Sequence, residues 1–135
     1  MIIWLNGSFG AGKTTAARGL TQALPDARLF DAEQVGYMLG SIGDLPALGD
    51  FQHWPPWRAL VVETARQVLD YVGGTLVIPQ TVLVHRYWQQ IRAGLAGAQI
   101  PVRHILLHAE PDTLTRRIDR DTAANRRRHH KADPE

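Results

Sequence analysis

Hydrophobic residues fall into short runs along the chain, and segments of helical character separate these runs. The first run covers residues 1–5, and residues 15–24 then carry apolar side chains at a helical spacing. Further strands are predicted at 28–30, 75–79 and 102–108, and the continuous apolar run at 75–79 is typical of a strand buried on both faces. Strands that alternate with helices predict an α/β fold with a parallel sheet.

The segments between these strands predict further helices and one long loop. A helix is expected over about 31–39, whereas residues 40–56 are rich in glycine, proline and aspartate and predict an irregular loop. A helix that begins with a proline is expected over 56–72, and another over roughly 85–95. A last helix is expected to open at Glu110. No internal repeat or linker interrupts this order, so residues 1–135 are interpreted as a single domain.

A glycine-rich motif follows the first strand directly. Residues 7–14 match the phosphate-binding pattern GxxxxGK[ST] at every fixed position. Between a strand and a helix N-terminus, the backbone N–H groups and the helix dipole converge on one anion site. Lys13 is expected to reach the β- and γ-phosphates and the Thr14 hydroxyl to ligate Mg²⁺, so ATP and Mg²⁺ are the predicted cofactors. The predicted nucleotide-binding residues are Gly7, Ser8, Phe9, Gly10, Ala11, Gly12, Lys13, Thr14 and Thr15.

Composition narrows the class of protein. With 135 residues and 44% hydrophobic content, the chain suits one globular domain. No apolar run approaches the roughly 20 residues that cross a bilayer, and no basic stretch precedes the first apolar run. The chain has no cysteine, which excludes disulfides and thiolate chemistry. A cytoplasmic location, where ATP is present, is the expectation.

The net charge of +2 conceals an uneven distribution. Before Arg116 the chain has eight Lys/Arg against nine Asp/Glu, and from Arg116 onward it has seven against four. A basic tail suits nucleic acid, an anionic membrane surface at which the protein is peripheral, or a lid that closes over a triphosphate. Nucleic-acid binding through Arg126 to Lys131 has little else to support it, because no aromatic stacking platform lies nearby in the sequence. No nucleic-acid partner is therefore expected.

Asp31 is the acidic residue that the pattern singles out. It follows the second strand directly, and ligands of parallel α/β sheets bind at the carboxyl ends of the strands. Glu33 is a weaker candidate, because Asp31 to Gln34 also has the pattern of a capped helix start. The third strand, in contrast, ends in Pro79-Gln80-Thr81 without an acid.

Several other side chains have two interpretations. The aromatic residues of the 40–56 loop and of the following helix suit either core anchors or the wall of a substrate groove. Arg58 lies in a first helical turn, where a cation is unfavourable, so it suits an anionic ligand or a solvated surface equally. His104 and His108 are interpreted as strand-edge or core histidines, because no ligand partner stands at a metal-binding spacing.

The motifs together resemble the tunicamycin-resistance family of ATP-binding proteins. The resemblance rests on the first strand with residues 7–14, on Asp31, on Asp50 to Gln52 leading to Trp57-Arg58-Ala59, and on 78–81. More broadly the chain is similar to the small P-loop kinases, such as nucleoside monophosphate, shikimate and gluconate kinases and chloramphenicol phosphotransferase. The implied fold is a three-layer P-loop NTPase with a parallel sheet. The chain ends before the fifth strand and the adenine loop of such kinases, so the C-terminal strand is expected to be missing.

The resemblance also implies roles for individual residues. Lys13 and Asp31 correspond to catalytic residues, Asp31 being the carboxylate that activates an acceptor hydroxyl. Residues 116–131 resemble an arginine-bearing lid, and 32–56 a substrate-side region. From the lid, Arg116 and Arg120 are expected to be catalytic and Arg117 to bind the nucleotide. The expected substrate-binding residues are Asp31, Phe51, Trp54, Trp57, Arg58 and Gln80.

The function implied is transfer of the γ-phosphoryl group of ATP to a hydroxyl of a tunicamycin-like nucleoside antibiotic. The alternative is a protein that binds ATP and sequesters the antibiotic without transfer, which the missing acid after the third strand favours. The sequence predicts no oligomeric state.

Overall fold

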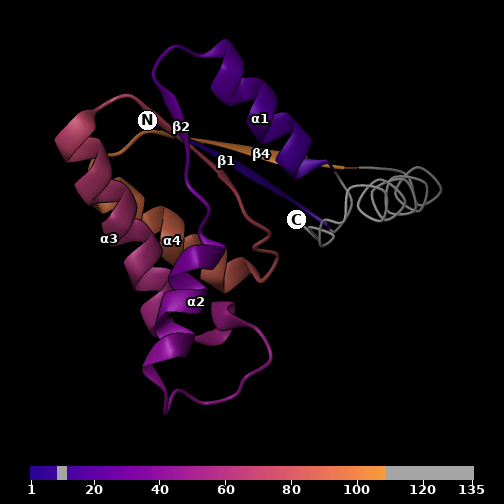
Figure 1. Cartoon of the computed structure of the whole chain (residues 1–135), viewed down its shortest axis with the longest axis vertical. Helices are drawn as coiled ribbons and strands as arrows, with labels where there is room; N and C mark the ends of the chain where they lie inside the picture. Colours follow the sequence, from indigo (N-terminus) through magenta and orange to yellow (C-terminus); the bar gives the residue numbers. More distant parts are fainter. Residues whose placement is uncertain (9–11, 109–135) are drawn as a thin grey trace.

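The structure is a computed structural model that describes residues 1–8 and 12–108. Helices and strands alternate as the sequence predicts (Figure 1). In chain order the elements are β1 (Ile2–Gly7), α1 (Lys13–Ala23), β2 (Ala27–Leu29), α2 (Glu33–Ile42), the 3₁₀ turn η1 (Phe51–His53), α3 (Pro55–Val72), β3 (Thr75–Pro79), α4 (His85–Gly97) and β4 (Val102–Leu107).

The described strands form one parallel sheet in the order β2-β3-β1-β4. β1 is central, with Ile2 level with Leu76 of β3 on one side and with Val102 of β4 on the other. All six residues of β1 are buried, as a strand covered on both faces requires. The predicted α/β fold with a parallel sheet is confirmed. Because every strand runs the same way, the loops after β1, β2 and β3 emerge at one edge of the sheet.

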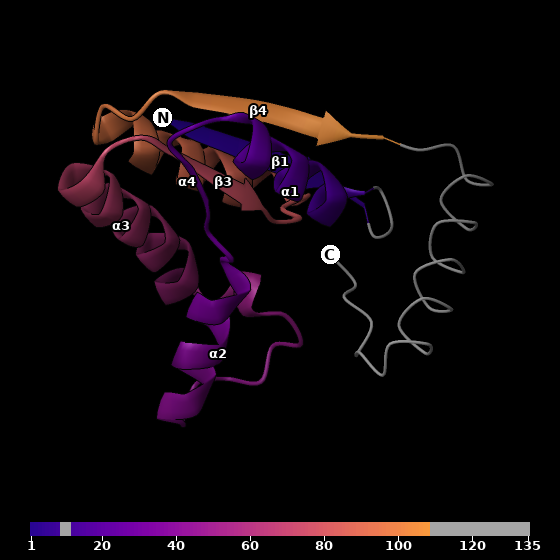
Figure 2. The same ribbon diagram turned by 45° about the horizontal axis from the view of Figure 1, so that its top comes forward.

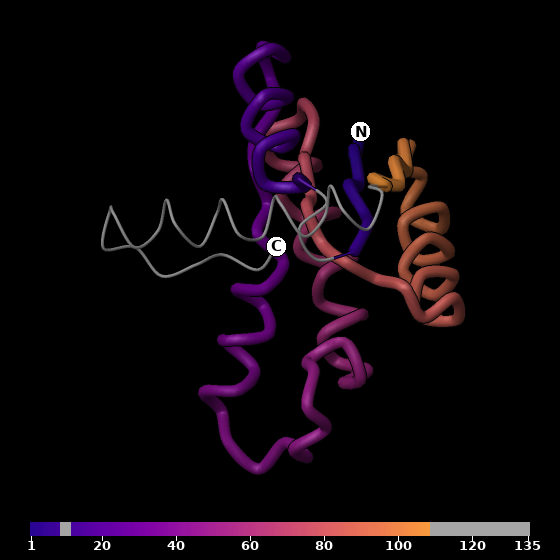
Figure 3. Tube along the Cα trace, turned by 90° about the vertical axis from the view of Figure 1, so that its right-hand side faces the viewer, coloured from indigo at the N-terminus to yellow at the C-terminus, as the bar shows by residue number. Residues whose placement is uncertain are grey.

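Alternate residues of β1 face two separate cores. Ile3 and Leu5 pack with Val77 of β3 against α1 through Ala17. Ile2 and Trp4 face the opposite side, where α2, α3 and α4 supply the buried residues. Figure 3 shows α1 and α4 on opposite sides of β1. The described residues therefore form three layers, helix on sheet on helix.

The larger core is built on aromatic rings. Trp4 is fully buried, and its Nε1 donates to the carbonyl oxygen of Gln80 at 2.9 Å. The Trp88 ring of α4 meets the Trp4 ring edge-on, with 5.1 Å between the centroids, and the His104 ring of β4 at 4.2 Å. These contacts fix α4 to the sheet next to the end of β3.

The α2–α3 region departs from the prediction in detail. α2 continues to Ile42 instead of ending near Leu39, and η1 lies within the segment expected to be an irregular loop. The Asp50 carboxylate caps η1 by accepting from Gln52 N at 3.0 Å, and Asp, Gly and Pro favour such local turns as readily as open loops. In Figures 1 and 2, α2 and this segment project from the sheet alongside α3.

Among the residues that the structure describes, no helix combines the length and the apolar character that a membrane span needs.

Candidate active site

The phosphate-binding motif begins at the end of β1 with a position that only glycine can occupy. Gly7 has φ of 145°, and a Cβ there would stand 2.5 Å from the carbonyl oxygen of Leu107 on β4. Both the backbone conformation and the close approach of β4 exclude a side chain. β1 can therefore turn into the loop while it stays paired with its neighbour.

Lys13 lies near the end of this motif and is the first residue of α1. Gly12 precedes α1 in the left-handed conformation, with φ of 91°. The Lys13 side chain is fully buried, and its Nζ donates to the carbonyl oxygens of Gly7 and Ser8 at 3.1 Å each. The ammonium group is thus held between the loop backbone and the N-terminus of α1, where helix N–H groups favour an anion. Thr14 and Thr15 follow in the first turn of α1.

Asn6 is a structural residue of the site that the sequence analysis missed. Its Oδ1 accepts from Gly7 N at 2.9 Å and from Val82 N at 2.8 Å, and its Nδ2 donates to Val82 O at 2.7 Å. A polar residue in an otherwise apolar strand just before the motif is the signal that would have found it. Through these hydrogen bonds, Asn6 connects the segment after β3 to the start of the phosphate loop.

Thr81 adds a second connection between the same segments. Its hydroxyl donates to Gly7 O at 2.7 Å, and its carbonyl oxygen accepts from Gln52 Nε2 of η1 at 2.6 Å. The end of β1, the segment after β3 and η1 are therefore joined at the carboxyl edge of the sheet.

Thr14 and Asp31 share one hollow of about 150 Å³ at this edge. The residues that line it come from α1, β2, the start of α2 and the end of β3: Thr14, Ala17, Arg18, Leu29, Asp31, Glu33 and Pro79. The Asp31 carboxylate accepts from Glu33 N at 3.2 Å and from Gln34 Nε2 at 3.3 Å. The start of α2 thus orients an exposed carboxylate next to the first turn of α1.

Glu33 lines the same hollow but makes a contact along its own helix. Its Oε2 accepts from the hydroxyl of Tyr37, one turn further on, at 3.3 Å. Of the two acids, Asp31 is the one that directly follows β2 and whose carboxylate accepts hydrogen bonds from the first residues of α2.

Phe51 and Trp54 line a second, apolar hollow of about 450 Å³ between α2 and the segment before α3. Gly36 and Gly40 form part of its wall. The Phe51 ring also packs on Trp57, with 5.0 Å between the centroids, and Trp54 Nε1 donates to Pro46 O at 2.8 Å. Phe51 and Trp54 therefore support the fold and also face an open space.

Trp57 and Gln80 are enclosed. Trp57 is fully buried and donates from Nε1 to Ala32 O at 3.0 Å, so its side chain has no surface open to a ligand, which favours the core-anchor interpretation. Gln80, 1% exposed, follows β3, and its Oε1 has no hydrogen-bond partner among the described residues. A buried acceptor without a partner suits a bound water or a ligand hydroxyl.

Arg58 is not a solvated surface residue, because only 9% of it is exposed. Its Nε donates to Gln90 Oε1 and its Nη1 to Gln52 O, both at 2.6 Å. The guanidinium carbon also lies 4.2 Å from the centroid of the Tyr87 ring. Arg58 therefore connects α3, η1 and α4, a position that nothing in the local sequence reveals.

His104 lies on β4, an outer strand of the described sheet, and its Nε2 is 3.3 Å from Asn6 Nδ2. Partial burial and the charge of Arg92 lower the pKa of His104 below its ordinary value of 6.5. The neutral ring can accept from Asn6 through Nε2. His104 thus extends the hydrogen-bond network that begins at the phosphate loop.

Of the predicted site residues, Gly7, Lys13, Thr14, Asp31 and Gln80 lie at the carboxyl edge of the sheet, and they suit a magnesium nucleotide. Phe51 and Trp54 line the separate apolar hollow, and Trp57 and Arg58 are buried. The buried Lys13 ammonium and the Thr14 hydroxyl, opposite a carboxylate, provide the donor set for a triphosphate and its metal. Within residues 1–8 and 12–108, no group of three or more His, Cys, Asp or Glu side chains is placed so that it could hold a metal ion. Phe9, Gly10 and Ala11 lie outside the described residues, as do the predicted lid 116–131 and its residues Arg116, Arg117 and Arg120.

The sheet order and the glycine-lysine-threonine turn define an α/β protein of the P-loop kinase-like class. A family model described as AAA domain matches residues 2–133, and the chain belongs to this family. No curated protein matches the chain.

Solved structures agree with this class. The tunicamycin resistance protein of Deinococcus radiodurans is 28% identical, with a TM-score of 0.77 over 89% of this chain and 70% of that one. A sugar kinase from Janibacter is 19% identical, with a TM-score of 0.62 over 87% of this chain and 65% of its own. The APS kinase of Mycobacterium tuberculosis is 20% identical, with a TM-score of 0.58 over 95% of this chain and 73% of its own. The expected resemblance to the tunicamycin-resistance family is confirmed, and the comparisons support a nucleotide-binding, kinase-like protein.

Proposed function

We propose that the chain is an ATP-dependent phosphotransferase that transfers the γ-phosphoryl group to a hydroxyl of a small molecule. The observation that carries the proposal is the hollow shared by Thr14 and Asp31. It brings a candidate metal ligand and a candidate general base together beside the buried Lys13. Phosphoryl transfer needs mainly positioning and charge neutralisation, and these residues can supply both.

Each residue has a defined role in this proposal. The Lys13 ammonium, now held by loop carbonyls, would neutralise the β- and γ-phosphates, and Thr14 would hold Mg²⁺. Mg²⁺-ATP supplies the phosphoryl group and part of the charge neutralisation. Asp31 would accept the proton of the acceptor hydroxyl while the new P–O bond forms and ADP leaves. Its hydrogen bonds to the start of α2 keep the carboxylate oriented for that step.

The acceptor is proposed to be a tunicamycin-like nucleoside bound on the side of residues 32–56. The support is the similarity to the Deinococcus radiodurans tunicamycin resistance protein together with the apolar hollow lined by Phe51 and Trp54. Apolar walls with a few polar groups are typical of small-molecule sites.

A second candidate is a protein that binds ATP and sequesters the same ligand without transfer. The observation that favours it is Gln80, a neutral residue directly after β3, where P-loop enzymes commonly hold the metal through a carboxylate.

Product analysis distinguishes the two functions. The protein is incubated with Mg²⁺-ATP and tunicamycin, and the mass of the antibiotic is measured, with Lys13→Ala as the control. A product heavier by one phosphoryl group, absent with Lys13→Ala, supports transfer. Unmodified antibiotic that nevertheless binds in the presence of ATP supports sequestration.

A further inference from the structure

We propose that the acceptor carries an alkyl chain, which binds in the apolar hollow of about 450 Å³ beside α2, and that Gly40 determines the room for this chain. The hollow is called the α2 hollow below. Its walls include Gly36, Tyr37 and Gly40 of α2 and Leu48, Phe51 and Trp54 of the segment before α3. The inference rests on the proposed function and narrows it, because it assigns the α2 hollow to a chain attached to the acceptor and not to the group that is phosphorylated.

The polar side chains around the α2 hollow already have hydrogen-bond partners. The Tyr37 hydroxyl donates to Glu33 Oε2 at 3.3 Å, and Trp54 Nε1 donates to a backbone carbonyl oxygen at 2.8 Å. The Asp50 carboxylate accepts from a backbone N–H at 3.0 Å. A sugar or a nucleobase that entered this hollow would give up hydrogen bonds to water, which is costly without replacement. An alkyl chain has none to give up, so the chemistry of these walls favours a chain.

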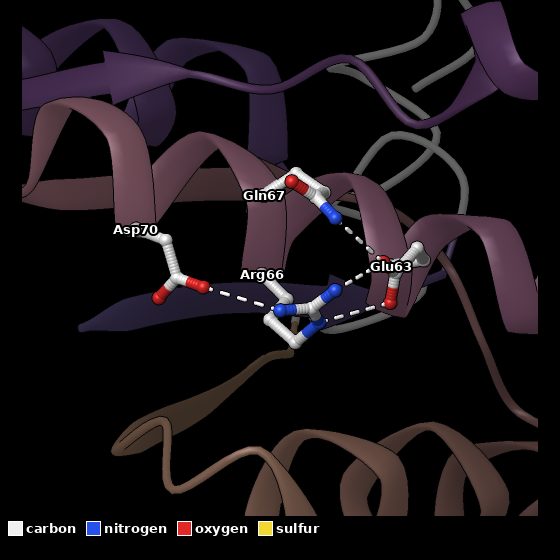
Figure 4. A network of polar contacts seen from close by, with 4 residues as sticks. All are labelled: Glu63, Arg66, Gln67 and Asp70. Carbon is white, nitrogen blue, oxygen red and sulfur yellow. Dashed lines mark hydrogen bonds and ion pairs between the residues drawn. The ribbon is translucent and has the colours of Figure 1, made fainter.

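The charge of the surrounding segment disfavours an anionic occupant. Residues 29–57 contain neither Lys nor Arg. The acids of this segment are Asp31, Glu33, Asp44 and Asp50. Further along α3, Arg66 is paired with Glu63 and Asp70 on the exposed face of the helix (Figure 4). A negatively charged segment repels a free fatty acid or an anionic membrane surface, so the chain is expected to belong to an uncharged part of the acceptor.

Two glycines of α2, one turn apart, shape the hollow in different ways. A Cβ on Gly36 would stand 2.6 Å from Cγ of Phe51, so the Phe51 ring already fills the space at that position. On Gly40, the nearest atom to such a Cβ is in the Trp54 ring at 4.0 Å, so the space there stays open. Because residues four apart lie on the same face of a helix, the filled and the open position are neighbours. The α2 hollow thus has an aromatic wall with free volume at Gly40 beside it.

The α2 hollow is open to the solvent. Tyr37 and Leu48 line it, yet they are 61% and 48% exposed. α2 and the segment that follows it project from the sheet, as Figure 2 shows. A chain that enters the hollow would cover apolar surface that water now contacts, which is the main source of affinity for such a ligand.

α2 also connects this hollow to the candidate active site. Glu33 lines the hollow that contains Asp31, whereas Tyr37 lines the α2 hollow, and the side chains of Glu33 and Tyr37 are hydrogen bonded to each other. From Glu33 to Gly40 the helix rises by about 10 Å. One acceptor could therefore place its hydroxyl at Asp31 and its chain at Gly40, if about that length separates the two groups.

The test measures chain binding without phosphoryl transfer. Octyl β-D-glucoside, below its critical micelle concentration, and methyl β-D-glucoside are titrated by calorimetry into the full chain saturated with Mg²⁺-ADP. The two compounds share a head group and differ only in the chain. We expect saturable binding of octyl glucoside and none of methyl glucoside. Hexyl glucoside should bind about tenfold more weakly than octyl glucoside, because it buries two methylene groups fewer.

A pair of leucine substitutions locates the chain. Gly40→Leu places a side chain in the open part of the α2 hollow, and Gly19→Leu is the matched control on α1, where a Cβ would meet no atom within 4 Å. The affinity for octyl glucoside should fall about tenfold or more in Gly40→Leu and stay unchanged in Gly19→Leu. If Gly40→Leu does not fold, Leu48→Ser decides, since this exposed residue lines the same hollow and its loss should also weaken binding.

Each other outcome overturns the inference. Absence of saturable binding of octyl glucoside does so, and equal affinity for methyl glucoside would indicate a sugar site. Equal affinities in the Gly40 and Gly19 variants would place the chain elsewhere. Co-sedimentation with phosphatidylcholine vesicles without binding of the monomeric glucoside would make the α2 hollow part of a membrane-docking surface. Chain binding can fail while tunicamycin is still phosphorylated, or succeed when no transfer occurs, so the inference and the proposed function are tested separately.

Discussion

Asn6 and Val82 are paired through both polar atoms of the asparagine side chain: Oδ1 accepts from Val82 N at 2.8 Å, and Nδ2 donates to Val82 O at 2.7 Å. The side chain thus imitates one more residue of sheet pairing at the point where β1 ends and the phosphate loop begins. Because the same Oδ1 also accepts from Gly7 N, the shape of the loop depends on the segment after β3.

Replacement of Asn6 by Ala should therefore weaken both the fold and the site. The change leaves buried backbone groups of Gly7 and Val82 without partners, which costs about 2–3 kcal/mol in the free energy of unfolding. ATP affinity should fall as well, because the loop loses its support. Urea unfolding and calorimetry measure the two effects, with the exposed Gln89→Ala as a control expected to stay within about 0.5 kcal/mol. Unchanged stability would contradict a structural role for Asn6.

Two glycines of α2 should respond in opposite ways to the same substitution. A Cβ on Gly36 would stand 2.6 Å from Cγ of Phe51, whereas on Gly40 the nearest atom, in the Trp54 ring, is 4.0 Å away. Gly36→Ala should lower the stability by about 1–2 kcal/mol through overpacking. Gly40→Ala should raise it by about 0.5–1 kcal/mol, since alanine is the better helix former. Thermal unfolding of both variants checks this, and equal shifts would show that Phe51 does not pack on α2.

Stability should decrease on acidification because of His104. Its pKa is lowered in the folded protein, so just below the ordinary value of 6.5 the unfolded chain binds the proton more readily. The neutral His104 ring therefore contributes fully to the free energy of unfolding above pH 6.5. This contribution is lost as the pH falls through the lowered pKa of the folded state. Urea midpoints at pH 7.5 and 5.5 should differ less in His104→Gln than in the unchanged protein. Identical differences would rule out a contribution from this histidine.

Lys13→Ala should weaken the binding of ATP without unfolding the protein. The ammonium makes its hydrogen bonds to loop carbonyls, and a charge-assisted contact to phosphate is worth about 1.5–3 kcal/mol. ATP affinity should consequently fall about 10- to 100-fold in calorimetry, whereas circular dichroism should show an intact fold. Wild-type affinity for ATP in the variant would contradict the assignment of the phosphate loop.

The fold and the phosphate loop could be predicted because their signals are local. Buried strands such as residues 75–79 are continuous apolar runs, and the glycines before Lys13 have a fixed spacing. The position of Asp31 followed from the direction of parallel strands alone.

Other features depend on contacts between distant segments and left no local signal. Arg58 is buried because η1 and α4 close over it, and Trp57 because its indole reaches Ala32, 25 residues earlier. The role of Asn6 depends on a partner 76 residues away. Residues 40–56 were expected to be an irregular loop throughout, but they include the 3₁₀ turn η1. Their composition could not distinguish the two, because Asp, Gly and Pro favour local turns as much as open loops.

The most direct test of the account is a comparison of Asp31→Asn with Glu33→Gln, two acids that line the same hollow. For each variant, the ATP dissociation constant and the rate of phosphorylation of tunicamycin are measured side by side. The account predicts that Asp31→Asn binds ATP within about threefold of the unchanged protein but loses transfer by a factor of about 10² or more. Glu33→Gln should retain transfer, because Tyr37 holds its carboxylate along α2. Full transfer by Asp31→Asn, or loss of ATP binding equal to the loss of transfer, would contradict the role proposed for Asp31.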